Sequence, residues 1–427
     1  MRKVLIAVFV AGFFFALFGT DSRVLTMGRY DAFFMDDISI FRNPANVSIY
    51  PNMLMGSLGI YKEDDELDAK GQYINPSTGD TLYSEPRYNR DPQKPFFGGI
   101  LSYSLNQSAD AGDQYPMLSI GVVLNRYDEM LDYITPGSRK FVGLENEALY
   151  SPITYVNPVG KVDFIMGVAL KNGAMIGGGA YVAFQKIKVD EDEEEETRLV
   201  RGNGGINLPV GKTMDLEVSV NGGVMTKIGK DSSNSLVTVA DNDVFVASDL
   251  RLFSALSSLN GDFVPHLGFK LIKFNSNDNR IFSFNAGFAV NVNIDRGFFW
   301  AGCEGFYEDN SAQRSEGYSS VDKMGGRISF GLERNIIWDW FVWRIGGTKV
   351  LGFQKVGKGS DATTKWFENP EADASDEDHV ATGWGLNIEN RFKVDCVLSE
   401  DIFYTFTNLI SGNHHHITAR ITATYSF

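Results

Sequence analysis

Cysteine, proline and positive charge are all scarce in this sequence. Only 2 cysteines occur in 427 residues, which excludes a disulfide-stabilised scaffold and a structural zinc cluster. The 13 prolines are few beside 44 glycines, and 13% of the residues are aromatic. Because aromatic residues favour strands and glycine favours turns, this composition indicates many strands joined by turns rather than a helical bundle.

The shortage of basic residues limits the partners of the chain. There are 39 lysines and arginines against 54 acidic residues, a net charge of −15. A broad nucleic-acid surface is excluded because the phosphates would be repelled. Apolar residues make up 43% of the chain and charged residues 22%, a balance that excludes general disorder. This length corresponds to about three average domains, but a β-barrel of this size forms one unit.

The first 19 residues have the layout of a secretory signal peptide. Arg2 and Lys3 precede an apolar stretch at residues 4–18, and Gly19 and Thr20 follow. The stretch is shorter than the ~20 residues that a membrane-spanning helix requires, which disfavours the alternative of an uncleaved anchor. We therefore predict a signal peptide at residues 1–19 and export of the mature chain.

Strict alternation of apolar and polar residues marks several later segments. In residues 282–294 every even position is apolar, whereas the odd positions carry Ser, Asn, Gly or Ala. Residues 384–398 repeat the pattern, with Asn390 as the only polar residue on the apolar face, and residues 118–125 and 214–221 give shorter examples. Such alternation predicts strands with one apolar and one polar face.

Strand length separates a soluble β-sandwich from a membrane barrel. Soluble strands average about five or six residues, whereas barrel strands need about 9–11 residues to cross the hydrocarbon. Several segments here alternate for more than ten residues. We therefore predict an all-β fold, a transmembrane antiparallel β-barrel of 14 and up to 16 strands. Its apolar faces meet lipid and its polar faces line the lumen.

Along the chain, the connections between the predicted strands alternate between long and short. Short turns such as residues 171–173, 295–297 and 399–401 alternate with long polar connections, as the periplasmic turns and outer loops of outer-membrane barrels do. The segment at residues 198–208 alternates poorly, which leaves fourteen strands as an alternative. The long connections are residues 62–96, 127–160, 188–197, 228–242, 308–322 and 353–382. The sixteen predicted strands begin near residues 53, 97, 117, 161, 175, 198, 213, 243, 262, 281, 298, 323, 339, 384, 402 and 416.

The chain ends in an amphipathic strand that closes with Tyr425 and Phe427. This ending resembles the C-terminal signal of bacterial outer-membrane proteins, which the barrel-insertion machinery reads. That machinery and outer-membrane lipid are therefore the predicted partners. Two aromatic clusters, at residues 338–343 and 298–300, predict a periplasmic girdle, because amphipathic rings favour the membrane interface. Ordinary core packing is the alternative for these clusters.

Residues 27–46 contain Gly28, the pair Asp36-Asp37, Ser39 and the motif Asn43-Pro44-Ala45. This stretch resembles the opening of the FadL-like superfamily of outer-membrane transporters, which includes PorV-type proteins of a secretion system. Arg29-Tyr30 and Asn46 depart from the small residues and the glycine of the family. The resemblance implies a fourteen-stranded barrel over residues 53–427 and an N-terminal segment, residues 20–52, folded into the lumen as a plug.

The residues of this N-terminal segment permit such a plug. Pro44 and Pro51 discourage pairing in a sheet, and a loose periplasmic tail is the alternative. Asp36 and Asp37 are expected to pair with cations of the lumen. The candidate cations are Arg251, Lys270, Arg327, Arg391 and Arg420.

Candidate catalytic and metal-binding groups are few. His266 falls on the polar face of its strand, where barrels routinely carry such residues. Residues 414–416 are histidines in a predicted outer loop without a neighbouring cysteine or carboxylate. The acidic run at residues 190–196, in another predicted outer loop, lacks the glycine of a calcium loop. Residues 177–179 are glycines without the lysine of a phosphate loop, which indicates curvature or close approach. We expect no enzymatic activity, no metal site and no cofactor.

Together these patterns predict a FadL-like channel for passive uptake of hydrophobic small molecules. Two alternatives stay open: a PorV-type anchor or shuttle for secreted proteins, with the long connections as docking surfaces, and a porin for polar solutes. A one-residue register shift would turn Arg391 and Lys393 toward lipid, at about 2–4 kcal/mol each near the midplane. Parity assigns to the lumen Asp249, Arg251, His266, Lys270, Arg327, Glu333, Glu389, Arg391, Lys393 and Arg420.

Overall fold

The computed structural model describes most of the chain after residue 20. The predicted signal peptide (residues 1–19), the histidines at 414–416 and the strand predicted from residue 402 lie outside the described residues. No helix among the described residues is long and apolar enough to cross a membrane. The described residues are 21–28, 30–58, 73–74, 81–82, 95–106, 115–128, 130–131, 158–190, 193–230, 236–238, 243–274, 279–310, 321–356, 363–367, 379–389, 391–399 and 420–427.

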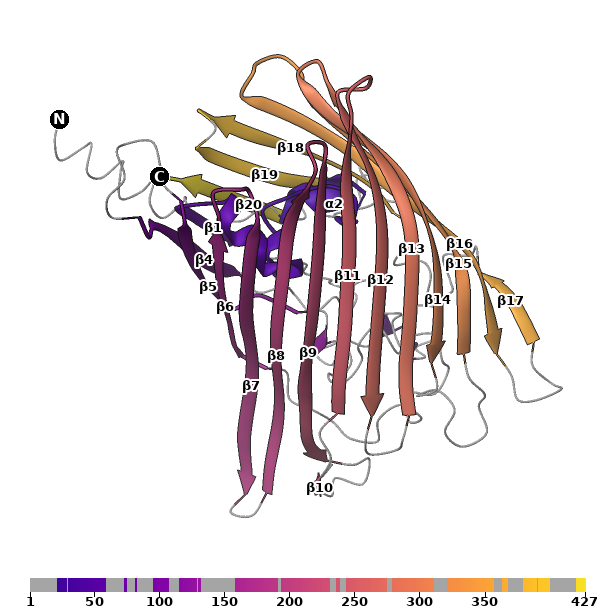
Figure 1. The fold of residues 1–427 in the computed structure, drawn as a ribbon. Helices are drawn as coiled ribbons and strands as arrows, with labels where there is room; N and C mark the ends of the chain where they lie inside the picture. Colours follow the sequence, from indigo (N-terminus) through magenta and orange to yellow (C-terminus); the bar gives the residue numbers. More distant parts are fainter. Residues whose placement is uncertain are drawn as a thin grey trace.

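Sixteen antiparallel strands form a closed ring (Figure 1). Closure is made by the first strand, which pairs with the second strand of the ring on one side and with the last on the other. The ring strands are β1 (Met53–Ser57), β4 (Phe96–Ser104), β5 (Met117–Leu124), β6 (Gly160–Ala169), β7 (Met175–Asp190), β8 (Glu193–Val210), β9 (Met214–Lys230), β11 (Asp243–Leu256), β12 (Gly261–Phe274), β13 (Asn279–Ile294), β14 (Gly297–Asn310), β15 (Val321–Asn335), β16 (Phe341–Val356), β18 (His379–Ile388), β19 (Phe392–Ser399) and β20 (Arg420–Ser426). Short strands extend the wall at β10 (Leu236–Thr238) and β17 (Thr363–Phe367), and β2 (Tyr73–Ile74) pairs with β3 (Thr81–Leu82).

The predicted all-β barrel is confirmed, with the larger of the two strand counts. The poorly alternating segment at residues 198–208 belongs to β8, which pairs along its length with β7 and β9. Its pattern is weak because Gly202, Gly204 and Gly205 give no side chain to either face. Backbone pairing does not need those side chains, so the strand forms despite the weak signal.

The two faces of the wall follow the predicted alternation. On β13, Phe284 and Phe288 are exposed on the outward face, whereas Ile281, Ala289 and Asn291 are buried on the inward face. The same division continues around the ring, with exposed outward side chains such as Val220 and Ile328. An apolar outward face on a closed ring of long strands is the arrangement of a membrane-spanning barrel.

The segment predicted as one strand at residues 384–398 is wrong in detail, because it is a hairpin. β18 ends at Ile388, and Ile388 pairs with Phe392 at the start of β19. Glu389 has a left-handed backbone, with a φ of 55°, which suits a turn. Paired residues lie on the same face, so the even-odd pattern passes through the turn unchanged. Asn390, the one polar residue on the predicted apolar face, lies outside the described residues.

The acidic run at residues 190–196 does not lie in a long outer loop as predicted. β7 continues to Asp190 and β8 begins at Glu193, so only residues 191–192 lie between the two strands. Glu196 pairs in register with Lys186, and the ammonium lies 3.8 Å from the carboxylate. Opposite charges across the ladder let acidic residues remain within the strands.

Two of the three residues in one predicted aromatic cluster lie inside the barrel rather than in a girdle, whereas Phe299 between them is on the outward face. Trp300 is fully buried, and it packs with Phe298 in a cluster on the inward face of β14. The other cluster is exposed: Trp338 and Trp340 stack with ring centroids 5.0 Å apart in the turn before β16. Alternation alone could not separate them, because an aromatic residue suits either face of the wall.

Candidate functional site: the inner wall and the N-terminal segment

The N-terminal segment, residues 21–50, lies within the ring of strands (Figure 1). It contains α2 (Asp21–Thr26), α3 (Ser39–Arg42) and the 3-10 helix η1 (Pro44–Ile49). α2 contacts β16, β18, β19 and β20, whereas η1 contacts β5, β6, β7 and β8. Only β1 and β4 separate these two groups in the ring. Between the helices, the carbonyl oxygen of Phe33 accepts a hydrogen bond from Asn291 on β13, on the far side of the ring, so the segment reaches across the lumen.

The Asn43-Pro44-Ala45 motif docks η1 on the wall. The Asn43 side-chain oxygen accepts a hydrogen bond from the Ala45 amide at 3.1 Å, which caps the helix. The side-chain nitrogen of Asn43 donates to the carbonyl oxygen of Ile206 on β8, also at 3.1 Å. One asparagine therefore starts the helix and ties it to the barrel.

Three glycines on neighbouring strands form a seat for this motif. Gly167, Gly177 and Gly205 are paired in register on β6, β7 and β8. A Cβ at Gly177 would lie 2.5 Å from the backbone of Pro44, and one at Gly205 would overlap the Asn43 side chain. The wall thus lacks side chains where the backbone of the segment touches it. The glycines at residues 177–179 include this close approach, one of the two interpretations that their sequence allowed.

A second glycine seat holds the other end of the segment. Gly331 and Gly346 pair in register on β15 and β16. A Cβ at Gly346 would lie 2.5 Å from the Gly28 nitrogen. Beside this seat, the indole nitrogen of Trp300 donates to the carbonyl oxygen of Met27 at 3.0 Å. Both ends of the segment are therefore fitted to the wall by backbone contact and hydrogen bonds.

His266 joins two carboxylates at the centre of the inner wall. Its ring nitrogens lie 2.8 Å from Asp249 and 2.9 Å from Glu304. A ring that donates to both carboxylates must carry a proton on each nitrogen. Glu304 also accepts from Tyr30 of the segment and from Arg327, at 2.5 and 2.8 Å. Asp249, His266 and Arg327, three of the predicted lumen residues, belong to this one network.

Arg251 supports the segment from β11. Its guanidinium is almost fully buried and pairs with Glu217 on β9. It also donates to the carbonyl oxygens of Asp31 and Phe34, at 3.1 and 3.3 Å. The pair neutralises two buried charges, and the remaining donors hold the turn of the segment.

Asp36 pairs with a cation of its own segment and not with the wall cations that were predicted. Arg23 lies 2.6 Å from Asp36 and 2.9 Å from Glu333 on β15. Arg344 continues the chain of charges, at 2.5 Å from both Glu333 and Asp395. Two of the predicted cations, Arg251 and Arg327, pair with the wall carboxylates Glu217 and Glu304, which sequence spacing could not reveal.

Asp37 lies beside this network as a buried carboxyl group. One of its oxygens is without a hydrogen-bond partner in the described structure. Burial, together with the neighbouring Asp36 carboxylate, raises the pKa of Asp37 well above its usual range. The segment therefore holds this side chain in its protonated form under conditions that would ionise an exposed carboxyl.

The remaining predicted lumen residues have different positions. Lys270 occupies an inward position of β12, in register with Ala247 and Ser283. Lys393 is exposed near the start of β19. Glu389 and Arg391 were also predicted to line the lumen. This prediction is wrong, because both residues lie exposed in the β18–β19 turn.

The end of the chain closes the ring. Arg420 starts β20 opposite Val397. The rings of Tyr425 and Phe427 stack at 6.3 Å, and Phe427 is exposed.

Sequence analysis missed a further charged group on the inner wall. Arg126 lies 2.7 Å from Asp163, and Arg201 lies 2.6 Å from Asp128. Arg126 also covers the ring of Phe41 in the segment, at 4.2 Å from its centroid. Asp163 occupies a polar position between the outward residues Val162 and Phe164, so the same alternation would have found it. Arg201 lies in the poorly alternating segment of β8, which gave no such signal.

An apolar belt lines the inner wall next to this charged group. It lies toward the outer ends of the strands relative to the glycine seat: Leu199, for example, precedes Gly205 on β8. The members are buried and pack as one cluster with Met130 and Leu131 of the β5–β6 connection. The belt residues are Tyr181, Ala183, Leu199, Met225, Phe245, Ile272 and Ile281.

No family model and no curated protein sequence matches this chain. Two solved structures align with it. The TodX deltaS2S3 mutant, a monoaromatic hydrocarbon channel, aligns over 96% of this chain and 97% of that chain, with 10% identity and a TM-score of 0.38. CdiB from Escherichia coli aligns over 88% of this chain and 63% of that chain, with 12% identity and a TM-score of 0.39. The membrane-barrel fold follows from the closed ring and its apolar outward face.

Proposed function

We propose that this protein is a channel of the bacterial outer membrane that admits hydrophobic small molecules by passive diffusion. The apolar belt inside the barrel carries the proposal. A lumen for polar solutes is lined by polar groups, whereas Leu199, Met225 and Phe245 give the inner wall a buried apolar lining that packs against Met130 and Leu131. The resemblance of residues 27–46 to FadL-like transporters supports the same function.

In this proposal the N-terminal segment acts as a plug. Its two glycine seats, the ion pair between Arg23 and Glu333 and the hydrogen bonds from Arg251 to its backbone hold it across the lumen. A segment held in this way denies polar solutes an open aqueous path. We therefore expect bilayers that contain the protein to show no large, steady ionic current. Such a current would contradict the plug and favour a general porin.

Uptake of a radiolabelled fatty acid into proteoliposomes tests the channel. Leu199→Asn places an amide in the belt, and Val200→Asn makes the same change on the lipid-facing side of the strand. We expect the inner variant to slow uptake several-fold and the outer variant to leave it near the wild-type rate. Heat-modifiable gel migration establishes that both variants are folded.

Two outcomes would overturn the proposal. Equal uptake by both variants would show that the apolar belt is not part of the transport path. Absence of uptake by the wild type, together with co-purification of a secreted protein, would identify an anchor or shuttle in place of a channel.

A further inference from the structure

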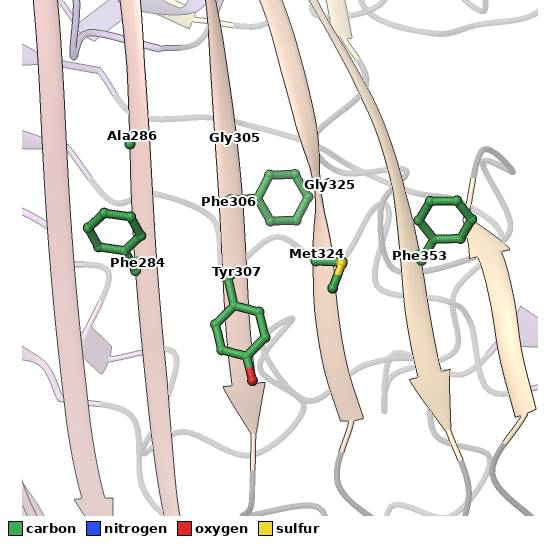
Figure 2. Close-up of a pocket in the computed structure, with 8 residues that line it drawn as sticks. All are labelled: Phe284, Ala286, Gly305, Phe306, Tyr307, Met324, Gly325 and Phe353. Carbon is green, nitrogen blue, oxygen red and sulfur yellow. The ribbon is translucent and has the colours of Figure 1, made fainter.

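The apolar belt is covered by residues of the chain itself. Leu199 and Met225 of the belt have no exposed surface. They pack in one cluster with Met130 and Leu131, which come from the connection between β5 and β6. The outward face differs, since Phe284 borders an apolar hollow on β13–β16 and stays exposed (Figure 2). Lipid covers an outward surface of this kind, whereas the belt has a cover from within the protein.

The chain turns into the lumen directly after β5. Asn125 has a left-handed backbone, with a φ of 66°, a conformation that asparagine tolerates. The hydroxyl of Tyr181 in the belt donates a hydrogen bond to the carbonyl oxygen of Arg126, at 3.1 Å. The guanidinium of Arg126 lies 2.7 Å from Asp163 on β6 and covers the ring of Phe41 in the N-terminal segment. These contacts fix the start of the connection inside the barrel.

Asp128 holds the two covering side chains in place. Its carboxylate lies 2.6 Å from the guanidinium of Arg201 on β8. The same carboxylate accepts a hydrogen bond from the Met130 amide at 3.0 Å. The carbonyl oxygen of Asp128 accepts one from the Leu131 amide, also at 3.0 Å. One residue therefore anchors to the wall the turn that presents both apolar side chains to the belt.

We propose that Asp128, Met130 and Leu131 form an internal cap that a hydrophobic molecule must displace to enter the belt. This inference rests on the proposed channel function and concerns how access to its apolar path is regulated. Because Leu199 and Met225 have no exposed surface, a molecule in the lumen cannot contact them while the cap is seated. Apolar attraction is not directional, so the cap and the cargo compete for the same surface.

An internal competitor lowers the apparent affinity for cargo. When the belt is free for only a fraction of the time, the apparent dissociation constant is the intrinsic constant divided by that fraction. A change that weakens the cap enlarges the fraction and lowers the concentration at which uptake is half-maximal. The cap therefore predicts an effect opposite in sign to the slower uptake expected of Leu199→Asn.

Leu131→Ala tests the cap. Leu101→Ala, on the lipid-facing side of β4, makes the same change outside the lumen and is the matched control. Uptake of radiolabelled oleate into proteoliposomes is measured over a range of concentrations. We expect Leu131→Ala to lower the half-saturating concentration several-fold and Leu101→Ala to match the wild type. Heat-modifiable gel migration establishes that both variants are folded.

Amide hydrogen exchange of the wild-type protein in detergent micelles gives a second readout that needs no variant. With oleate, we expect several-fold faster exchange at Met130 and Leu131, because displacement of the cap breaks their hydrogen bonds to Asp128. The Ala174 amide is the matched control. It also donates to a side chain two positions earlier, that of Asn172, but it lies in the short turn between β6 and β7, so its exchange should not change.

Two results would contradict the cap and leave the channel intact. These are uptake by Leu131→Ala with the wild-type concentration dependence, and saturable wild-type uptake without faster exchange at Met130 and Leu131. Equal acceleration at Ala174 would also contradict the cap, because oleate would then loosen the whole protein. If neither the wild type nor Leu131→Ala takes up oleate, the channel proposal fails, and the exchange result alone decides whether a hydrophobic ligand displaces the cap.

Discussion

The two faces of the barrel wall differ in how closely their residues are matched to partners. Gly177 and Gly178 are neighbours on β7, yet a Cβ at Gly177 would collide with the backbone of Pro44, while one at Gly178 would meet a single oxygen at 3.5 Å. Arg251 faces inward and contacts Glu217 and two carbonyl groups, whereas Leu252 beside it belongs to the outward face. The inner face requires particular residues, and much of the outer face requires only apolar ones.

Breaking the Arg251–Glu217 pair should have the largest effect on the free energy of unfolding. Arg251→Met leaves the Glu217 carboxylate buried without its cation, and we expect a loss of about 3–5 kcal/mol in the free energy of unfolding. Leu252→Met on the outward face should change it by about 0.5 kcal/mol or less. Urea unfolding in lipid vesicles measures both. Similar losses for the two variants would show that the inner face is no more specific than the outer.

The glycine seat gives a sharper test with two adjacent residues. Gly177→Ala forces the Pro44 backbone away from the wall, and we expect a cost of about 1–3 kcal/mol, the usual range for overpacking. Gly178→Ala should be close to neutral. Protease protection of the N-terminal segment should fall in the first variant and stay unchanged in the second. Full protection in Gly177→Ala would contradict docking of η1 by backbone contact.

Replacing Asp37 should have the smallest effect on stability, and the size of that effect should depend on pH. Its pKa is raised in the folded protein, so the folded state keeps a proton that the unfolded chain loses above about pH 4. Stability from this group is therefore lost as pH rises from that value toward the raised pKa. Asp37→Asn should remove this loss and protect the segment better near neutral pH than the wild type does.

The control for this prediction is the neighbouring carboxyl. Asp36→Asn makes the same chemical change but breaks the ion pair with Arg23, so it should weaken protection at neutral pH. Limited proteolysis across a pH series follows both variants. If the difference between Asp37→Asn and the wild type stayed constant over the series, Asp37 would not be the titrating group.

The sequence predicted the wall better than the contents of the lumen. Twelve of the predicted strand starts between residues 53 and 339 lie within two residues of the observed starts, and the start predicted at 198 is five residues late. The errors came where alternation carries no information. The turn at Glu389 preserves parity, Glu196 is held in a strand by a lysine on its partner, and Trp300 fits either face by polarity. Glu196 and Trp300 are fixed by contacts with residues elsewhere in the chain, Lys186 on β7 and Met27 in the N-terminal segment.

In the candidate site, too, the sequence predicted the face on which a residue lies but not the residue that it contacts. Parity placed Asp249, Arg251 and His266 on the polar face, and these residues lie on the inner wall. Their partners were not predictable: Asp36 contacts Arg23 of its own segment, and His266 joins two carboxylates from different strands. An ion pair depends on distance in space, and residue spacing along the chain does not measure distance between strands.

The period-two pattern alone determines that this chain forms long amphipathic strands, because each side chain's face depends on its own strand. The partner of each inner residue is decided only when the ring closes. Register then brings together groups far apart in the chain, such as Tyr30 with Glu304 and Trp300 with Met27. The glycine seats have the same origin, since each is a row assembled from neighbouring strands.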